Sequence, residues 1–482
     1  MRLPRTFACL THHGTLLCCD RRSGRLVHRR PGHLQPHEVP AELHPDLHPG
    51  HGAGLTGLAV IDPDNAARAG GRLLGRFEVI PGPRGRIAHL RRAGLFLCAE
   101  PGGGCAVDRT EPLGWESFVL LDPAQMRALA HVGANRWVLR DGGMVIEPDS
   151  IGFGSAFGWR FGPQTFDLAA GHPIGGVADE MFTAFTPLRD GWRLQPEAVL
   201  FRPMVYFAAL GEAALFEQLR WSLVSLREVA GYTGHLHIIS DRARAEMDQF
   251  VPAAWRGSYT LQPCHAASRH EFTAARFAVL DWPSAWQFQP LLYVDTDVAF
   301  DAPIEPILAR IALGRDLSAQ MEDFARLHAH APAGALLFQA DGYDPGEHAC
   351  GVNSGVIGIP SLEANAGMLR LCRDVAWGWQ RGPGAEALWK GDQPAVNYVL
   401  HRRAAVDHGV VTPHVAVGGP EPPTTLGPRV GLVHFWAAGP QTRKAAAMEA
   451  YVRLLLQHRP DDGAAAPDGT SQIDFPPLFV GA

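Results

Sequence analysis

The sequence predicts a chain of two parts, an all-β module followed by an α/β domain. Its 482 residues exceed one ordinary domain. Hydrophobic residues make up 46% and charged residues 19%, a balance that supports sizeable cores rather than disorder. Near residue 190, short β-like runs separated by Gly, Pro and Asp give way to apolar strands alternating with long helical stretches. We therefore expect domains at 1–190 and 196–460, and a partly flexible tail at 461–482.

A weak internal repeat organises the first part. Segments 14–30, 94–110 and 135–149 each join two apolar runs through a turn containing Gly or Asp, which indicates hairpins. Each hairpin is flanked on both sides by another apolar run. Three copies of four short strands are typical of a β-trefoil, because no single copy can bury its own apolar face. The second copy, with the string GWESFVL at 114–120, resembles the fascin-like branch of β-trefoils.

Between the first two hairpins lies a proline-rich segment that carries five histidines. Their spacing is irregular and no cysteine joins them, so we favour an exposed loop over a metal-binding tract. The five are His33, His37, His44, His48 and His51.

Charge and cysteine usage limit the environment of the protein. The formal net charge is -6 without a basic bias, which does not suggest a nucleic-acid partner. No apolar run of about 18 residues predicts a transmembrane segment, and three polar residues at 11–13 break the N-terminal apolar run, which makes it a poor secretory signal. The eight cysteines form no CxxC pair, and Cys18 and Cys19 are adjacent. We expect reduced thiols in a cytoplasmic protein.

The strongest chemical signal is LLYVDTDVAF at 291–300. Residues 291–294 are typical of a buried strand, which runs directly into Asp295 and Asp297. The C-terminal edge of an α/β sheet is where such folds bind ligands. Carboxylates suit Mg²⁺ and Mn²⁺, and such a cation neutralises a diphosphate leaving group. D-x-D also occurs by chance on surface loops, but the buried strand before it favours a metal site.

Two further segments carry candidate ligands. His434 follows the apolar run 430–433, so a neutral imidazole there could complete a two-carboxylate site and favour Mn²⁺ over Mg²⁺; the alternative is a core histidine. Asn353 offers a donor and an acceptor to a sugar hydroxyl, and Gly355 allows close backbone approach, or the segment is a simple turn.

Residues 391–400 predict a helix beginning beside two polar residues, Asp392 and Gln393. Asp392 could be the helix N-cap, because Pro394 suits a first turn. Alternatively, the carboxylate of Asp392 has a functional role in the site.

From 201 to 455 the chain resembles the nucleotide-diphospho-sugar transferases of the GT-A fold, closest to glycosyltransferase family 8. Five blocks occur in the order of that family: VYFAAL at 205–210, RFAVLDWPSAWQFQPLLYVDTDV at 276–298, GVNSGVIGIP at 351–360, GDQPAVNYVL at 391–400 and VHFWAAGP at 433–440. The chain departs from the family at Pro394, where an Asp is usual. It also departs after His434, where a diphosphate-binding lysine is displaced and Arg443 or Lys444 could substitute.

The resemblance implies a role for each matched residue. The metal ligands would be Asp295, Asp297 and His434. Asp392 would bind the donor sugar and Gln393 would lie near the reacting carbon, with no nucleophile assigned. Arg276 would contact the nucleotide-sugar, unless it is an exposed helix charge. The remaining residues implied to bind the nucleotide-sugar are Ala208, Asp295, Thr296, Asn353, Ser354, Gly355 and Lys444.

The function implied is transfer of a hexose from a nucleotide-sugar, preferably a UDP-sugar, to a hydroxyl of a saccharide or other acceptor, with retention at the anomeric carbon. A divalent cation, Mn²⁺ preferred and Mg²⁺ possible, would be the cofactor. A nucleotidyltransferase is one alternative, but the segment GEAALFEQLR after the first strand lacks the Gly-rich loop it would need. A lectin-like protein with an inactive transferase domain is another, although the intact triad argues against it.

Overall fold

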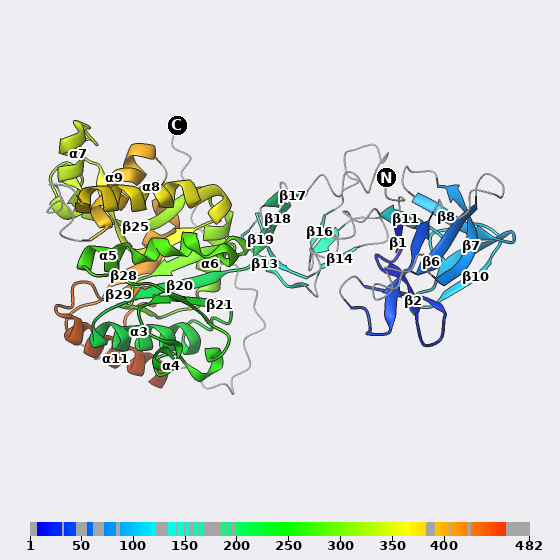
Figure 1. Cartoon of the computed structure of the whole chain (residues 1–482), viewed down its shortest axis with the longest axis horizontal. Helices are drawn as coiled ribbons and strands as arrows, with labels where there is room; N and C mark the ends of the chain where they lie inside the picture. Colours follow the sequence, from blue (N-terminus) through cyan, green and yellow to red (C-terminus); the bar gives the residue numbers. More distant parts are fainter. Residues whose placement is uncertain are drawn as a thin grey trace.

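The computed structural model describes 7–30, 33–44, 55–60, 72–82, 87–121, 134–140, 142–148, the strands listed below between 151 and 194, 198–381, 391–404, 406–421 and 426–458. The predicted tail at 461–482 and two of the five histidines, His48 and His51, lie outside these residues. Figure 1 draws the N-terminal strands and the α/β part as separate bodies.

The N-terminal strands form one sheet that closes on itself. β11 pairs with both β1 and β8, while β8, β7, β6, β5 and β1 pair in turn, so six strands make a closed ring from which the hairpins β2–β3 and β9–β10 extend. Inside it pack side chains such as Cys9, Leu17, Phe77, Leu97 and Phe118. The strands are β1 (Phe7–Thr11), β2 (Leu16–Asp20), β3 (Leu26–Arg29), β4 (Glu38–Pro40), β5 (Glu42–His44), β6 (Leu55–Val60), β7 (Arg72–Pro81), β8 (Ile87–Arg92), β9 (Leu95–Ala99), β10 (Cys105–Arg109) and β11 (Phe118–Leu121).

This pairing corrects the predicted repeat. The hairpins expected at 14–30 and 94–110 are β2–β3 and β9–β10. The third forms from β12 (Arg136–Leu139) and β13 (Val145–Ile146), but β12 pairs with β19 (Ala198–Phe201) in a different sheet. The prediction of a third equivalent copy was therefore wrong, because a hydrophobic pattern predicts a hairpin but not the strand beside it. The β-trefoil assignment of the first part of the chain stays a prediction.

Two small sheets follow the closed ring in the chain. The sheet that contains β12 has the order β13-β12-β19-β18-β17, with β17 at Phe185–Leu188 and β18 at Gly191–Leu194. The other is formed by β14 (Ile151–Phe153), β15 (Trp159–Phe161) and β16 (Gln164–Phe166).

The C-terminal part is an α/β domain around a mixed seven-stranded sheet, as the sequence predicted. The strand order is β22 (Thr260–Pro263), β21 (His235–Ser240), β20 (Met204–Ala209), β23 (Leu291–Val294), β26 (Cys350–Ile359), β25 (Leu317–Arg326) and β27 (Val406–Asp407). β22, β21, β20 and β23 are parallel, and β26 is antiparallel to β23. A smaller sheet has the order β24 (Val298–Phe300), β29 (Leu432–His434) and β28 (Val415–Val417).

Helices cover both faces of the large sheet, because side chains alternate along its buried strands. Val205 and Phe207 of β20 pack into a core shared with α3 and α6, whereas Met204 and Tyr206 pack into one shared with α8 and α9. In Figure 1, α8 and α9 lie above the strands of the large sheet and α3 lies below them. The helices are α3 (Ala213–Glu228), α4 (Arg244–Met247), α5 (Arg269–Ala274), α6 (Glu305–Leu313), α7 (Ala335–Asp341), α8 (Leu362–Arg381), α9 (Gln393–Arg403), α10 (His408–Val411) and α11 (Gln441–Gln457), with 3₁₀ turns η3 (Ala253–Trp255), η4 (Ala275–Asp281), η5 (Pro283–Gln287), η6 (Ala331–Ala333) and η8 (Thr412–His414).

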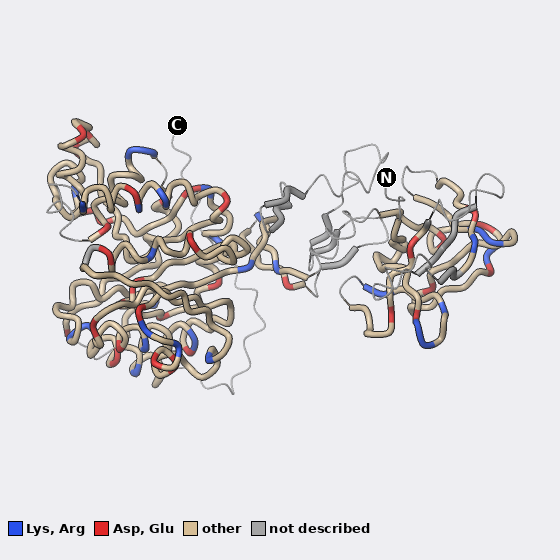
Figure 2. Tube along the Cα trace, viewed as in Figure 1, with Lys and Arg blue, Asp and Glu red and all other residues tan. Residues whose placement is uncertain are grey.

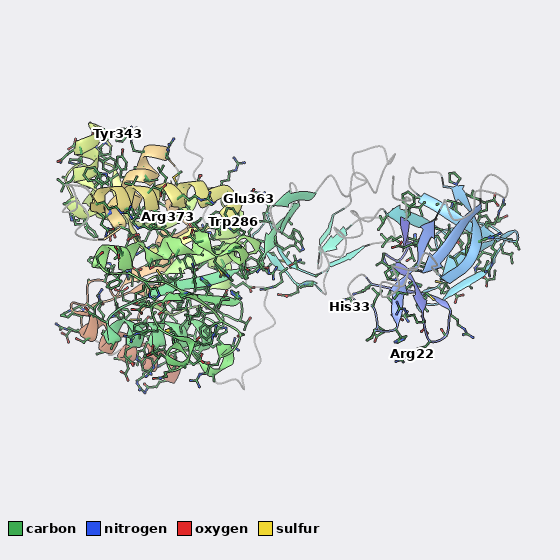
Figure 3. The ribbon with its side chains drawn as sticks, in the orientation of Figure 1. Arg22, His33, Trp286, Tyr343, Glu363 and Arg373 are labelled. Atoms are coloured by element: carbon green, nitrogen blue, oxygen red, sulfur yellow. The ribbon has the colours of Figure 1, made fainter. Side chains whose placement is uncertain are left out.

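The surface of the described chain mixes both signs of charge. Lys and Arg alternate with Asp and Glu along the described trace (Figure 2). Arg22, in the turn after β2, is exposed, and Arg373 of α8 forms an ion pair of 3.2 Å with Asp281 (both arginines are labelled in Figure 3). None of the helices in the described part of the chain is both long and apolar enough to span a membrane.

Candidate functional site

The turn between β23 and β24 places two carboxylates at the edge of the large sheet. β23 is fully buried and ends at Val294, and β24 begins at Val298, so Asp295-Thr296-Asp297 forms the crossing from the large sheet to the small one. The Asp295 amide donates to the carbonyl of Gly355 on β26 at 2.7 Å. The carbonyl of Asp297 accepts from the Phe435 amide at 2.9 Å. Backbone contacts to both sheets therefore fix the turn.

His434 joins these carboxylates from the small sheet. It is the last residue of β29 and lies opposite Val298 of β24. Its Nε2 is 3.1 Å from Asp297 Oδ1, and one ligand atom from each of Asp295, Asp297 and His434 lies within 4.8 Å of the others. The predicted strand-end position is confirmed, and the structure brings the three predicted metal ligands together.

Lys444 adds a positive charge to the same group. It lies in the first turn of α11, and its Nζ is 2.6 Å from Asp297 Oδ2. Burial by itself raises the pKa of Asp297, but His434 and Lys444 outweigh burial and hold that pKa below the usual range of a carboxyl. Asp297 is therefore an anion with cationic and hydrogen-bonding partners. Of the two basic residues considered from the sequence, Arg443 instead pairs at 2.7 Å with exposed Glu421.

Arg276 connects the acidic turn to α9. Its side chain is 4% exposed, so the prediction of an exposed helix charge is wrong. It donates to Asp295 Oδ1 at 3.2 Å and to the carbonyl of Ser354. Its Nε donates to the carbonyl of Thr273 at 3.0 Å and lies 3.1 Å from Asp392 Oδ2, an ion pair without a hydrogen bond.

Asp392 lies at the start of α9, yet its side chain does not cap that helix. Its alternative role as a side-chain N-cap is therefore wrong. Burial raises the pKa of Asp392 to about 6; Arg276 opposes this rise and Asp295 adds to it. Such a carboxylate sits beside Arg276 with one oxygen lacking a hydrogen bond among the described residues. A buried carboxylate oxygen without a hydrogen bond lowers the stability of a fold, and such groups are common at functional sites.

The segment at 353–355 forms the floor between these groups. Asn353 Oδ1 accepts from the Gly355 amide at 2.8 Å, and its Nδ2 donates to Glu322 Oε1 at 2.8 Å. Gln393 also donates to Glu322, at 3.3 Å. A Cβ on Gly355 would lie 2.3 Å from His434 Cε1 and 2.9 Å from an oxygen of Asp295. The simple-turn interpretation is wrong, because Gly355 lies inside a strand and leaves room for the triad.

These residues line one cavity of about 970 Å³. Apart from Gly355, which lies beneath the triad, every residue predicted for the site contributes to its wall: Ala208, Arg276, Asp295, Thr296, Asp297, Asn353, Ser354, Asp392, Gln393, His434 and Lys444. The sequence analysis missed other lining residues, among them Gln218, Glu322, Phe324, His330 and Trp436. Gln218 accepts from Thr296 at 3.3 Å and reaches Gln441 of α11. Glu322 and Phe324 occur in a strand that carries no motif, but Trp436 could have been noticed two residues after His434.

The site fits a divalent cation on its own chemistry. Two carboxylates and an imidazole are a ligand set for Mn²⁺ or Mg²⁺, and the nitrogen favours Mn²⁺. His434 Nδ1 is buried without a hydrogen-bond partner among the described residues, which leaves this imidazole less constrained than a core histidine would be. Among the described side chains, this triad is the only group of three or more metal-ligating residues close enough to hold one ion, so His33 and His37 belong to no such group.

Comparisons with known proteins give little further help. No family model matches the chain, and no curated protein matches it. Among solved structures, the chain is similar to the crystal structure of the galactosyltransferase LgtC in complex with donor and acceptor sugar analogs. That match has 16% sequence identity and a TM-score of 0.37, and it covers 52% of this chain and 95% of the other. A likeness this distant does not assign a function to the chain.

Proposed function

We propose that the chain is a metal-dependent glycosyltransferase of the GT-A fold that transfers a hexose from a UDP-sugar to an acceptor hydroxyl. The observation that carries the proposal is the acid–acid–imidazole triad of Asp295, Asp297 and His434 at a sheet edge, in one cavity with buried Arg276 and Lys444. A site with both a cation-binding triad and two basic side chains suits a diphosphate. Each of the five sequence blocks that resemble the family contributes residues to the wall of this cavity, which supports a nucleotide-sugar as the donor.

Each side of the cavity has a part in this proposal. The triad would hold Mn²⁺ or Mg²⁺, which when bound neutralises the diphosphate leaving group. Lys444 is placed to contact a phosphate from the first turn of α11, where free amide groups also favour anions. Asn353 and Asp392 offer hydrogen-bonding groups to the sugar. Gln393 borders the reacting carbon.

The reaction forms a bond between the acceptor hydroxyl oxygen and the anomeric carbon of the donor sugar. The bond between that carbon and the diphosphate breaks, and the diphosphate leaves with the electron pair, while the hydroxyl proton passes to the diphosphate or to water. We include retention of configuration at the anomeric carbon because the sequence resembles a family with retaining members. No described carboxylate is assigned as nucleophile.

Three further assignments complete the proposal. The β-trefoil predicted in the first part of the chain either holds a glycan acceptor or serves as a packing or oligomerisation module. The α/β domain extends over 196–460. The protein acts in the cytoplasm, which its eight free cysteines support.

The test is Mn²⁺-dependent hydrolysis of UDP-glucose and UDP-galactose by the full chain. We expect turnover with Mn²⁺ and none after chelation, and loss of turnover in Asp297→Asn. Asp374→Asn is the matched control, because Asp374 is exposed on α8. Binding of UDP without turnover of either sugar would favour the inactive, lectin-like alternative. Release of pyrophosphate from UTP and a sugar phosphate would favour a nucleotidyltransferase.

A further inference from the structure

A second cavity, of about 1020 Å³, lies at the amino ends of the parallel strands. Pro203 on its wall directly precedes β20, His235 begins β21, and Phe288 lies shortly before β23. The cavity of the candidate site is instead lined from the carboxyl ends of these strands, as by Ala208 of β20. The two cavities share no lining residue and lie at opposite edges of the large sheet. The second cavity is therefore outside the proposed nucleotide-sugar site.

The wall of the second cavity is largely apolar and comes from two units of the fold. Asn135 and Arg136, where β12 begins, line it together with residues of α3, α6 and β21. Three of its aromatic side chains, Tyr232, Trp255 and Phe288, are only 4–5% exposed. Ligand sites in proteins are mostly apolar with a few polar groups, and they often lie where two structural units meet.

Two arginine side chains on this wall lie over the aromatic rings. Cζ of Arg202 is 5.4 Å from the ring centroid of Phe288, and Cζ of Arg227 is 5.7 Å from that of Trp255. Nη1 of Arg227 also donates to the carbonyl of Tyr232 at 3.2 Å. In the described part of the chain, neither guanidinium group forms an ion pair with a carboxylate. A contact with a ring face positions a guanidinium group but leaves its charge available to an anion.

The other charged groups of the wall do not offset these two arginines. Glu305 is the only carboxylate among the described lining residues, and it pairs with Arg136 at 2.7 Å. Burial and the charge of Arg202 lower the pKa of His235 to about 4, so this imidazole is neutral near pH 7. The cavity thus combines an aromatic wall with the positive charges of Arg202 and Arg227.

We propose that this cavity is a second ligand site and that it binds an organic anion with an aromatic ring. The ring of the ligand lies against Trp255 and Phe288, and its carboxylate or phosphate accepts hydrogen bonds from Arg202 and Arg227. Guanidinium groups bind both kinds of anion through charge-assisted hydrogen bonds. The site does not depend on the proposed transferase function, because it lies at the other edge of the sheet.

The experiment titrates the full chain, without metal or nucleotide, with 1-naphthoate, 1-naphthyl phosphate and the neutral analogue 1-naphthamide in a calorimeter. We expect at least one anion to bind, and 1-naphthamide to bind at least about tenfold more weakly, the loss expected when a hydrogen bond to a charged group is removed. Arg202→Gln and Arg227→Gln should each lower the affinity for that anion roughly 10–100-fold. The anion that binds more tightly distinguishes a carboxylate ligand from a phosphate ligand.

Three further variants locate the binding. Arg220→Gln is the matched control, because Arg220 is an α3 arginine over the ring of Phe250, at 5.3 Å, that does not line the cavity. Lys444→Ala tests the other cavity, to which Lys444 belongs. Both variants should bind the anion as the wild type does. Ala254→Glu adds a repelling carboxylate at an exposed position of the wall and leaves both arginines in place, so it should weaken binding.

Four results would overturn the proposal. Neither anion binds at millimolar concentrations, or 1-naphthamide binds as tightly as the anions. Alternatively, the affinity stays unchanged in Arg202→Gln, Arg227→Gln and Ala254→Glu, or Lys444→Ala loses as much affinity as these variants do. If circular dichroism shows that an arginine variant does not fold, Ala254→Glu and the comparison with 1-naphthamide still decide the question.

Discussion

At the scale of single residues, Gly355 leaves room for the proposed metal ligands because it has no side chain. An added Cβ would meet His434 Cε1 at 2.3 Å and an Asp295 oxygen at 2.9 Å, distances at which something must move. We predict that Gly355→Ala weakens Mn²⁺ binding in the presence of UDP roughly 10–100-fold, the range for disturbing the surroundings of metal ligands. Calorimetric titration of Mn²⁺ measures this.

Gly367→Ala is the control for that substitution. Gly367 lies within α8 and an added Cβ would meet nothing within 4 Å. Alanine favours the helix, so this variant should be as stable as the wild type or more so, with the same Mn²⁺ affinity. An unchanged Mn²⁺ affinity in Gly355→Ala would contradict the triad as a metal site.

Asp392 gives a residue-scale prediction for pH. Its folded pKa of about 6 exceeds the ordinary 3.8, so between these values the folded state binds more protons than the unfolded state. Its contribution to stability is therefore complete below the unfolded pKa and is lost as pH rises through the folded pKa. Asparagine does not titrate. The unfolding free energy of Asp392→Asn minus that of the wild type should thus rise from about pH 4 to pH 6.

Urea unfolding of the free protein across this range, without Mn²⁺ or nucleotide, measures that difference. Asp374→Asn is the matched control, because Asp374 is exposed on α8 and does not line the cavity. A difference that falls or stays level for Asp392→Asn would mean that Arg276 keeps the buried carboxylate ionised throughout.

At the scale of elements, α11 determines which of two adjacent basic residues enters the site. Successive helical residues point about 100° apart, and Lys444 faces Asp297 while Arg443 is exposed beside Glu421. We predict that Lys444→Ala lowers UDP affinity about 10–100-fold in the presence of Mn²⁺, as expected for a lost hydrogen bond to a charged group. Arg443→Ala should bind UDP as the wild type does.

Mn²⁺ titration without nucleotide tells this role from damage to the metal site. Lys444 occupies one oxygen of Asp297, so its removal should leave Mn²⁺ affinity equal or higher. Loss of Mn²⁺ affinity in Lys444→Ala would show that the lysine positions Asp297 instead of binding phosphate. A drop in UDP affinity in Arg443→Ala would contradict this prediction, because Arg443 on the exposed side of α11 would then contact the phosphate.

The local sequence predicted the strands and helices that carry the site. It predicted the contacts between these elements less well. The apolar run ending at Val294 predicted both the strand and the position of Asp295, because burial and its termination are local signals. The burial of Arg276 could not be predicted, since it depends on Asp392, more than a hundred residues away. Glu322 was missed because it acts through Asn353 and Gln393 on neighbouring elements. The partner of β12 was also missed, since pairing is a long-range choice.

At the scale of the whole molecule, the apolar cores divide the described chain. One core lies entirely within the closed N-terminal sheet and includes Leu97. The cores of the α/β domain include Val138 of β12, so the β12–β13 hairpin packs with the second part although it was predicted to belong to the first. Arg136 of the same strand pairs with Glu305 of α6 at 2.7 Å. A chain with separate cores should unfold in separate steps.

We therefore predict two calorimetric unfolding transitions that respond to different changes. UDP with Mn²⁺ at about 100 times its Kd should stabilise the α/β transition by about 2.7 kcal/mol and leave the other in place, because the proposed binding site lies in the folded α/β domain. Leu97→Ala should do the reverse and destabilise the N-terminal transition by about 2–5 kcal/mol, since this leucine is fully buried in the N-terminal core. A single transition that both changes shift together would show that the two parts fold as one unit, and the N-terminal sheet would then be part of the scaffold of the α/β domain instead of a separate module.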